Sequence, residues 1–184
     1  MRIVILDRKT LGNDVNVDIF NKFGEVEVFD ITKENETKDR VKDADIVITN
    51  KVMISKEVME NSNLKLICIS ATGKNNVDLE YAKQKGIEVK NVAGYSSSSV
   101  SQVAFSMIFH FVSKLNYYKN YVDQGNWQKS EIFTHIDKPF FELDNKRVGV
   151  IGLGDLGSSF AKRAKAFDCE VVYYSTSGRN NNSE

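Results

Sequence analysis

Residues 148–157 read VGVIGLGDLG. The apolar run before the first motif glycine predicts a β-strand over residues 147–151, and a helical pattern with Leu156 and Phe160 on one face follows it to about residue 167. A G-x-G-x-x-G turn between a strand and a helix is typical of dinucleotide-binding folds. Gly152 permits the tight turn, Gly154 lets the backbone approach a pyrophosphate, and Gly157 lets the helix pack closely on the sheet.

The start of this predicted helix is a candidate anion site. Its free N–H groups and the positive end of its dipole would face the phosphates of a bound dinucleotide. A glycine-rich turn without any ligand is the alternative interpretation. The strand before the turn and the helix after it favour the dinucleotide, because the mechanism of the motif requires both.

The second predicted strand of this region covers residues 169–174, and the residue after it bears on the choice of cofactor. NAD enzymes usually carry an Asp or Glu there, about 20 residues past the glycines, to bind the ribose hydroxyls. This chain has Ser175 instead. With no carboxylate to repel a 2′-phosphate, Ser175 and Arg179 favour tolerance of NADP. In a second interpretation, which stays open, the Ser175 hydroxyl binds the ribose of NAD and Arg179 lies in solvent.

Short apolar runs alternate with helical patterns in the first half of the chain. This alternation predicts parallel strands, an α/β fold and a three-layer arrangement with helices on both faces of a sheet. We expect a domain over residues 1–94, with strands at 2–6, 26–29, 45–49, 64–69 and 87–90 and helices within 14–23, 37–42, 55–61 and 76–85.

A second domain is expected over residues 95–184. It opens with a serine-rich turn at 94–99 and a single long helix over residues 100–123. Apolar residues recur along this helix at four-residue spacing, and more than one of its faces is apolar. We therefore expect a homodimer formed through this helix.

The composition excludes some classes of partner. The chain has 25 basic and 25 acidic residues, so bulk charge provides no surface for nucleic acid or membranes. We expect no transmembrane segment and no signal peptide, because no apolar run is long enough for either. Cys68 and Cys169 lie in apolar runs and are expected to be buried free thiols, which is typical of a reducing cytoplasm. No metal site is expected.

Three segments, at residues 70–78, 92–102 and 141–154, resemble the D-isomer-specific 2-hydroxyacid dehydrogenases. The resemblance is greatest to the glycerate dehydrogenase (hydroxypyruvate reductase) branch of that family. It implies a flavodoxin-like substrate domain followed by the first part of a Rossmann-type NAD(P)-binding domain. It also implies hydride transfer between NAD or NADP and a small 2-oxo acid such as hydroxypyruvate or glyoxylate.

The resemblance assigns roles to individual residues. The backbone N–H groups of Thr72 and Gly73 would hold the carboxylate of the substrate. Lys51 would line the same cleft, although a solvated lysine is the favoured interpretation of that residue. In the nucleotide domain, Ser99 and Val100 match positions near the nicotinamide, with helix capping and packing as the alternative. Asp155 and Leu156 match positions over the pyrophosphate.

The resemblance also implies that the catalytic groups lie outside this sequence. The family uses an arginine, a glutamate and a histidine that follow the second half of the nucleotide domain. The histidines present, His110 and His135, match neither the place nor the role of the catalytic base. We therefore assign no catalytic residue, expect a chain that resembles only the N-terminal part of the family, and expect no turnover by the chain alone.

Other classes of protein compete with this interpretation. A non-catalytic module that senses NAD(H) would bind the cofactor without hydride transfer, and a truncated product would have no activity of its own. A receiver-like signalling domain would need an acidic cluster after the first strand and an Asp after the third. The sequence offers only Asp7 after the first strand and Thr49-Asn50 at the end of the third.

Overall fold

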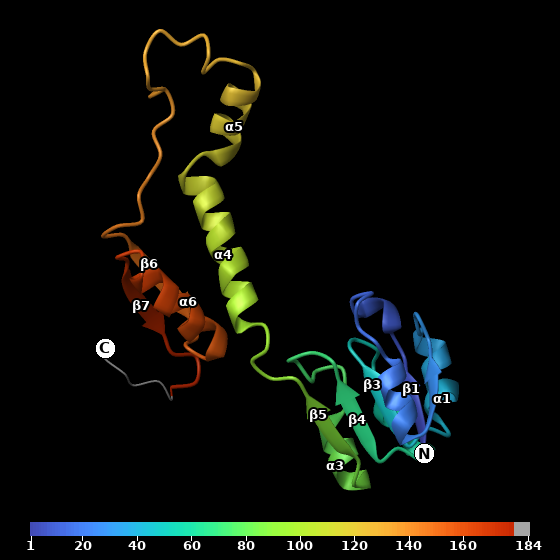
Figure 1. Cartoon of the computed structure of the whole chain (residues 1–184). Helices are drawn as coiled ribbons and strands as arrows, with labels where there is room; N and C mark the ends of the chain where they lie inside the picture. The colour runs from blue at the N-terminus through green and yellow to red at the C-terminus, as the bar shows by residue number, and fades with distance from the viewer. Residues whose placement is uncertain (179–184) are drawn as a thin grey trace. The chain divides into compact units, whose positions relative to one another are not determined.

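The computed structural model describes residues 1–178, so Arg179 lies outside the described residues. Contacts between Cα atoms divide the chain into two compact units, one of residues Met1–Ala93 and one that begins at Gly94. Figure 1 shows the helices and strands of both units. Each unit is an α/β structure with a parallel sheet, as the sequence predicts.

The sheet of the first unit has five strands in the order β2-β1-β3-β4-β5. All four pairings are parallel, and this is the strand order of flavodoxin-like folds. Because every strand runs the same way, the carboxyl ends of all five lie along one edge. The strands are β1 (Arg2–Ile5), β2 (Glu25–Val28), β3 (Ile46–Thr49), β4 (Leu66–Ile69) and β5 (Glu88–Asn91).

Three helices of this unit pack on the same face of the sheet. α1 (Glu34–Val41), α2 (Lys56–Glu60) and α3 (Leu79–Lys85) share one buried cluster with alternate residues of β1, β3 and β4. The two-residue repeat of the strands points Val4, Val47 and Ile67 into this cluster, and each is fully buried.

The expectation of three layers is wrong for residues 1–178 of this structure. Where a helix was expected within 14–23, the chain forms a short 3₁₀ helix, η2 (Asp18–Phe23), which contacts β2. A second one-turn 3₁₀ helix, η1 (Arg8–Thr10), follows β1. Ile3 and Ile5 are buried on this second face, but their neighbours Ile48 and Cys68 are only partly buried, because no α-helix of the unit covers them.

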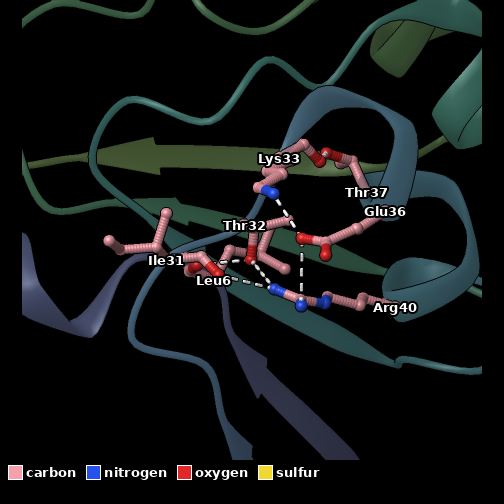
Figure 2. Close-up of polar contacts among 7 residues, drawn as sticks. All are labelled: Leu6, Ile31, Thr32, Lys33, Glu36, Thr37 and Arg40. Atoms are coloured by element: carbon pink, nitrogen blue, oxygen red, sulfur yellow. Dashed lines mark hydrogen bonds and ion pairs between the residues drawn. The ribbon is translucent and has the colours of Figure 1, made fainter.

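A polar network fixes the start of α1 against the end of β1 (Figure 2). Glu36 accepts a hydrogen bond from the Lys33 N–H at 2.9 Å and forms an ion pair with Arg40 at 3.0 Å. Arg40 donates to the Thr32 hydroxyl, and that hydroxyl donates to the carbonyl of Leu6. These contacts satisfy N-terminal helix groups and hold the end of β1 in place.

The second unit has a two-stranded parallel sheet, formed by β6 (Arg147–Ile151) and β7 (Glu170–Tyr174) and joined by α6 (Asp155–Lys165). α6 packs against α4 (Ser97–Val112), and the Phe105 ring stacks on Phe160 with centroids 4.7 Å apart. Cys169 is buried in the same cluster. On the opposite face of the sheet, Ile151 is 83% exposed and Tyr174 is 69% exposed.

The expected single helix over residues 100–123 is wrong. The structure has two helices, α4 and α5 (Leu115–Asp123), separated at Lys114, whose backbone is left-handed with φ 54°. A left-handed residue cannot continue a right-handed helix. The carbonyl of Val112 accepts a hydrogen bond from the Phe141 N–H at 3.1 Å, so the end of α4 is satisfied by a distant segment.

Within residues 1–178, no helix combines the length and the apolar character needed to cross a membrane. Both thiols are free, as expected. Cys169 is buried, but Cys68 is only partly buried, which corrects the expectation for that residue. Its side of β4 is the sheet face that lacks an α-helix.

Candidate functional site

The first unit gathers the expected substrate-binding residues at one place. Lys51 follows β3, and Thr72 and Gly73 follow the neighbouring strand β4. Because β3 and β4 are parallel, the loops that leave their carboxyl ends lie at the same edge of the sheet. We call the loops 50–54 and 70–77 the carboxyl edge.

Thr72 and Gly73 present unpaired backbone donors at this edge. Both residues are exposed, and their N–H groups donate to no acceptor within residues 1–178. The other polar groups of Thr72 are occupied: its carbonyl accepts from Asn91 Nδ2 at 2.6 Å, and its hydroxyl donates to the Val92 carbonyl at 3.2 Å. Fixed, unpaired N–H groups of successive residues can bind an anion such as a carboxylate.

Lys51 adds an exposed cation at this edge, and its backbone is fixed by a hydrogen bond. Its side chain is exposed and has no ion pair with any described residue. Its N–H donates to Asp7 Oδ2 at 2.8 Å. The sequence analysis assigned no supporting role to Asp7, Asn76 or Asn91. The signal for Asp7 was an acid directly after an apolar strand, and the signal for the asparagines was an amide side chain at or after a strand end.

The glycine-rich turn of the second unit has the geometry that its motif predicts. Gly152 has φ 85°, in the left-handed region. A Cβ at Gly157 would lie 2.0 Å from the Gly152 carbonyl oxygen, so only glycine allows this approach of α6 to β6. A Cβ at Gly154 would meet no atom within 4 Å, so this side of the turn is open. Such a cradle fits the pyrophosphate of a dinucleotide.

The first turn of α6 has free donors above the same turn. No side chain caps the helix at Gly154. The N–H groups of Asp155 and Leu156 donate to no acceptor within residues 1–178, and Leu156 is 48% exposed. These two residues therefore present N–H groups at the positive end of an 11-residue helix.

Ser175 follows β7 in the same unit. Its hydroxyl oxygen is buried and has no hydrogen-bond partner among the residues that the structure describes. A buried hydroxyl without a partner is costly, so this position fits a hydroxyl or phosphate oxygen of a ligand. The other residue expected to choose between NAD and NADP, Arg179, lies outside the described residues.

Ser99 and Val100 lie in the first two turns of α4. Both are exposed, and Ser99 Oγ donates to the Ser96 carbonyl at 3.0 Å. This end of α4 is tied to α6, because Arg163 donates to Ser98 Oγ at 2.9 Å and to Ser159 Oγ at 2.6 Å. The structure thus brings Ser99 and Val100 into the unit that carries the glycine turn, and their exposure leaves them free to contact a ligand.

The histidines have structural surroundings. His135 stacks on Tyr121 with ring centroids 3.8 Å apart and is hydrogen-bonded to the Tyr117 hydroxyl at 2.7 Å. His110 is hydrogen-bonded to Asn116 at 3.1 Å. In both rings Nε2 is hydrogen-bonded within the protein, and neither histidine belongs to the carboxyl edge or to the glycine-rich turn.

The thiols are not activated. Burial raises the pKa of the Cys68 thiol, and the nearby Glu88 raises it further. Burial also raises the pKa of the Cys169 thiol, with Asp168 as a second cause. A raised pKa keeps a thiol protonated at neutral pH, whereas a nucleophilic cysteine needs a lowered one.

The comparison with protein families agrees with this geometry. A family described as "D-isomer specific 2-hydroxyacid dehydrogenase, catalytic domain" matches residues 3–182. The chain belongs to the D-isomer-specific 2-hydroxyacid dehydrogenase family. Its α/β architecture with parallel sheets is the fold of that family.

Individual relatives show how much of a dehydrogenase this chain spans. It is 35% identical to a hydroxypyruvate reductase of Blautia hydrogenotrophica, over 95% of this chain and 56% of the relative. It is 34% identical to a glycerate dehydrogenase of Methylorubrum extorquens, over 94% of this chain and 55% of the relative. The chain thus spans about half the length of the curated relatives that it matches.

The solved structures show the same fold. An acyclic imino acid reductase in complex with NADPH and D-Arg superimposes with a TM-score of 0.81 and 29% identity, over 98% of this chain and 58% of that chain. The TT0316 protein of Thermus thermophilus superimposes with a TM-score of 0.80 and 26% identity, over 96% of this chain and 57% of that chain.

The close approach at Gly157 leads to a stability prediction. We expect Gly157→Ala to lower the free energy of unfolding of the second unit by about 1–3 kcal/mol, because the new Cβ must push α6 away from the Gly152 carbonyl. Gly149→Ala is the matched control, since a Cβ there meets no atom within 4 Å. Urea unfolding measures both, and equal stability of the two variants would contradict the steric argument.

Proposed function

We propose that this protein provides the substrate-binding edge and the cofactor cradle of an NAD(P)-dependent oxidoreductase. The reaction interconverts a small 2-oxo acid, such as hydroxypyruvate or glyoxylate, and its D-2-hydroxy acid. The observation that carries the proposal is the pair of unpaired N–H groups at Thr72 and Gly73. They lie at the carboxyl edge of a family member that also has the glycine cradle. Hydroxypyruvate, glycerate and glyoxylate in the names of the relatives support this class of substrate.

The chemistry assigns a role to each group of the chain. The N–H groups of Thr72 and Gly73 hold the substrate carboxylate, and the Lys51 ammonium attracts it. The N–H groups of Asp155 and Leu156 would hold the pyrophosphate of the cofactor at the glycine-rich turn. When bound, the nicotinamide supplies or accepts the hydride. Ser99 and Val100 would contact the nicotinamide.

The proposal assigns no proton-transferring residue to the chain. The family resemblance places the arginine, glutamate and histidine of catalysis in a later part of the fold, and His110 and His135 are occupied within the protein. The residues present bind and orient, but none of them is placed to protonate the carbonyl oxygen. Activity therefore requires groups beyond those named above.

Purified residues 1–184 should accordingly show no oxidation of NADH or NADPH with hydroxypyruvate, followed by absorbance at 340 nm. The same sample should still quench or shift the fluorescence of NADH as it binds. Measurable turnover would overturn the proposal that the catalytic groups lie elsewhere. The alternative of a non-catalytic NAD(H)-sensing module predicts the same cofactor binding. A form with the full length of the relatives separates the two: in our proposal it reduces hydroxypyruvate, whereas a sensing module does not.

The choice between NAD and NADP depends on Ser175 in this proposal. The position after β7 has a buried hydroxyl without a partner and no carboxylate, so the chain should accept NADPH as well as NADH. Ser175→Asp would introduce a carboxylate beside the ribose. Its negative charge would repel the 2′-phosphate of NADPH, and its oxygens would accept hydrogen bonds from the ribose hydroxyls of NADH.

We expect Ser175→Asp to weaken NADPH binding at least about tenfold while NADH binding is kept. Isothermal titration of both cofactors measures the two dissociation constants. Ser175→Ala is the control, because it removes the hydroxyl without adding charge and should still bind NADPH. A wild-type chain that binds only NADH would contradict the tolerance that we propose.

A homodimer is the second part of the proposal. α4 packs on its own unit through Phe105, and its opposite side exposes Val103, Met107 and Phe111, at 51%, 59% and 71%. An apolar stripe that repeats every four residues on one helix is typical of a helix that covers another copy. Leu115 lies in α5, beyond the break at Lys114, and is also 50% exposed.

Light scattering should therefore give a mass of twice 20.8 kDa for the chain, and Phe111→Glu should shift it to the monomer, because a buried carboxylate without a partner opposes association. Val28→Glu is the control: it makes the same apolar-to-acid change at an exposed position of β2 in the first unit. A Phe111→Glu protein that stays dimeric would place the contact elsewhere.

We also infer a cytoplasmic location, with a small 2-oxo or 2-hydroxy acid as the partner and no nucleic acid or membrane. The support is the balanced charge of the chain and the free state of both thiols.

A further inference from the structure

A buried carboxylate lies directly below the carboxyl edge. Asp7 follows β1, the strand next to β3, and only 7% of its surface is exposed. Its oxygens accept hydrogen bonds from three consecutive residues at the end of β3 and directly after it: the Thr49 hydroxyl at 3.2 Å, the Asn50 N–H at 3.0 Å and the Lys51 N–H at 2.8 Å. Asp7 is too deeply buried to reach a substrate, but it fixes the backbone that carries Lys51.

The contacts extend from Asp7 to the second loop of the edge. The Thr49 hydroxyl, which donates to Asp7, accepts the Val52 N–H at 3.1 Å. The Val52 carbonyl accepts from Asn76 Nδ2 at 3.0 Å, and Asn76 is itself 5% exposed. The Asn76 carbonyl then accepts the Ile54 N–H at 2.8 Å. This chain of hydrogen bonds joins loop 50–54 to loop 70–77, which contains Thr72 and Gly73.

We propose that Asp7 is a positioning residue for substrate binding, which sets Lys51 and the Thr72 and Gly73 amides at a fixed spacing by holding Thr49, Asn50 and Lys51. This inference rests on the proposed function of the carboxyl edge. Hydrogen bonds to a carboxylate are stronger than those to a neutral acceptor. Several such bonds from one loop therefore leave that loop few alternative conformations. Preorganised groups bind an anion better because no ordering is needed on binding.

Charge alone predicts the opposite effect of Asp7. A negative charge below the edge repels an anionic 2-oxo acid, so its removal would tighten binding if electrostatics were decisive. In our proposal its removal weakens binding, because an Asn offers the three donors only a neutral amide oxygen in place of Oδ2 and turns its NH2 group toward the Asn50 N–H. The sign of the change in affinity therefore separates a positioning role from a mere field effect.

The test is a titration of the ¹⁵N-labelled full chain with hydroxypyruvate, followed by the amide resonances of residues 50, 51, 72 and 73. Asp7→Asn should raise the dissociation constant about tenfold. Asp45→Asn is the matched control. Asp45 also accepts a backbone N–H, from Arg2 at 2.8 Å, and a lysine ammonium, but it lies at the amino end of β3. It should leave the dissociation constant unchanged.

A second pair of variants keeps the test decisive if Asp7→Asn does not fold. Thr49→Val removes the hydroxyl that links Asp7 to Val52 at almost the same volume, whereas Thr49→Ser keeps it. We expect Thr49→Val to weaken hydroxypyruvate binding and Thr49→Ser to bind hydroxypyruvate as well as the wild type does. A general packing role for the fully buried Thr49 would give the reverse order, because Val fills the site better than Ser.

The outcomes separate two kinds of failure. A folded Asp7→Asn or Thr49→Val chain that binds hydroxypyruvate as well as the wild type, or more tightly, overturns the positioning role and leaves the proposed function intact. A wild-type chain whose amides at 72 and 73 do not respond to hydroxypyruvate overturns the substrate edge itself. In that case the proposed function fails together with this inference.

Discussion

The parallel pairing of the strands decides where the polar groups of this protein meet. In the first unit, β1, β3, β4 and β5 all point the same way, so Asp7, Lys51, Thr72 and Asn91 emerge at or beside one edge although they are far apart in the sequence. In the second unit, the parallel pair of β6 and β7 places Gly152 and Ser175 at the same end. A reversal of any one strand would carry its polar residue to the opposite edge.

Local pattern was sufficient wherever one residue type is required by geometry. The order of apolar strands and helices predicted all five strands of the first sheet, because each alternation is a short-range signal. The glycine turn was predictable at the level of single residues, since the Gly157 contact with the Gly152 carbonyl admits no side chain. Thr72 and Gly73 were placed through the family resemblance, and their free N–H groups agree with that assignment without testing it.

The errors arose where distant segments decide the local conformation. Next to the helix break at Lys114, the Val112 carbonyl at the end of α4 accepts the Phe141 N–H, from a residue 29 positions further along the chain. The helix expected from residue 37 begins at Glu34, because Glu36 and Arg40 complete a network with Lys33 and Thr32. A single lysine such as Lys114 belongs to no sequence pattern that predicts a left-handed backbone. The support that Asp7 gives to Lys51 has the same origin, since the two residues meet only through the pairing of β1 with β3.

The outer strands of the two sheets differ in a way that bears on solubility. β2 and β5 have free backbone edges, but charged residues interrupt them: Glu25 and Glu27 in β2, and Glu88 and Lys90 in β5. Charges on an edge strand discourage backbone pairing between molecules. β7, in contrast, carries a single charge at Glu170, followed by four apolar and aromatic residues, and Val172 and Tyr174 are exposed. Beyond Glu170, β7 therefore lacks the charged residues that discourage such pairing along β2 and β5.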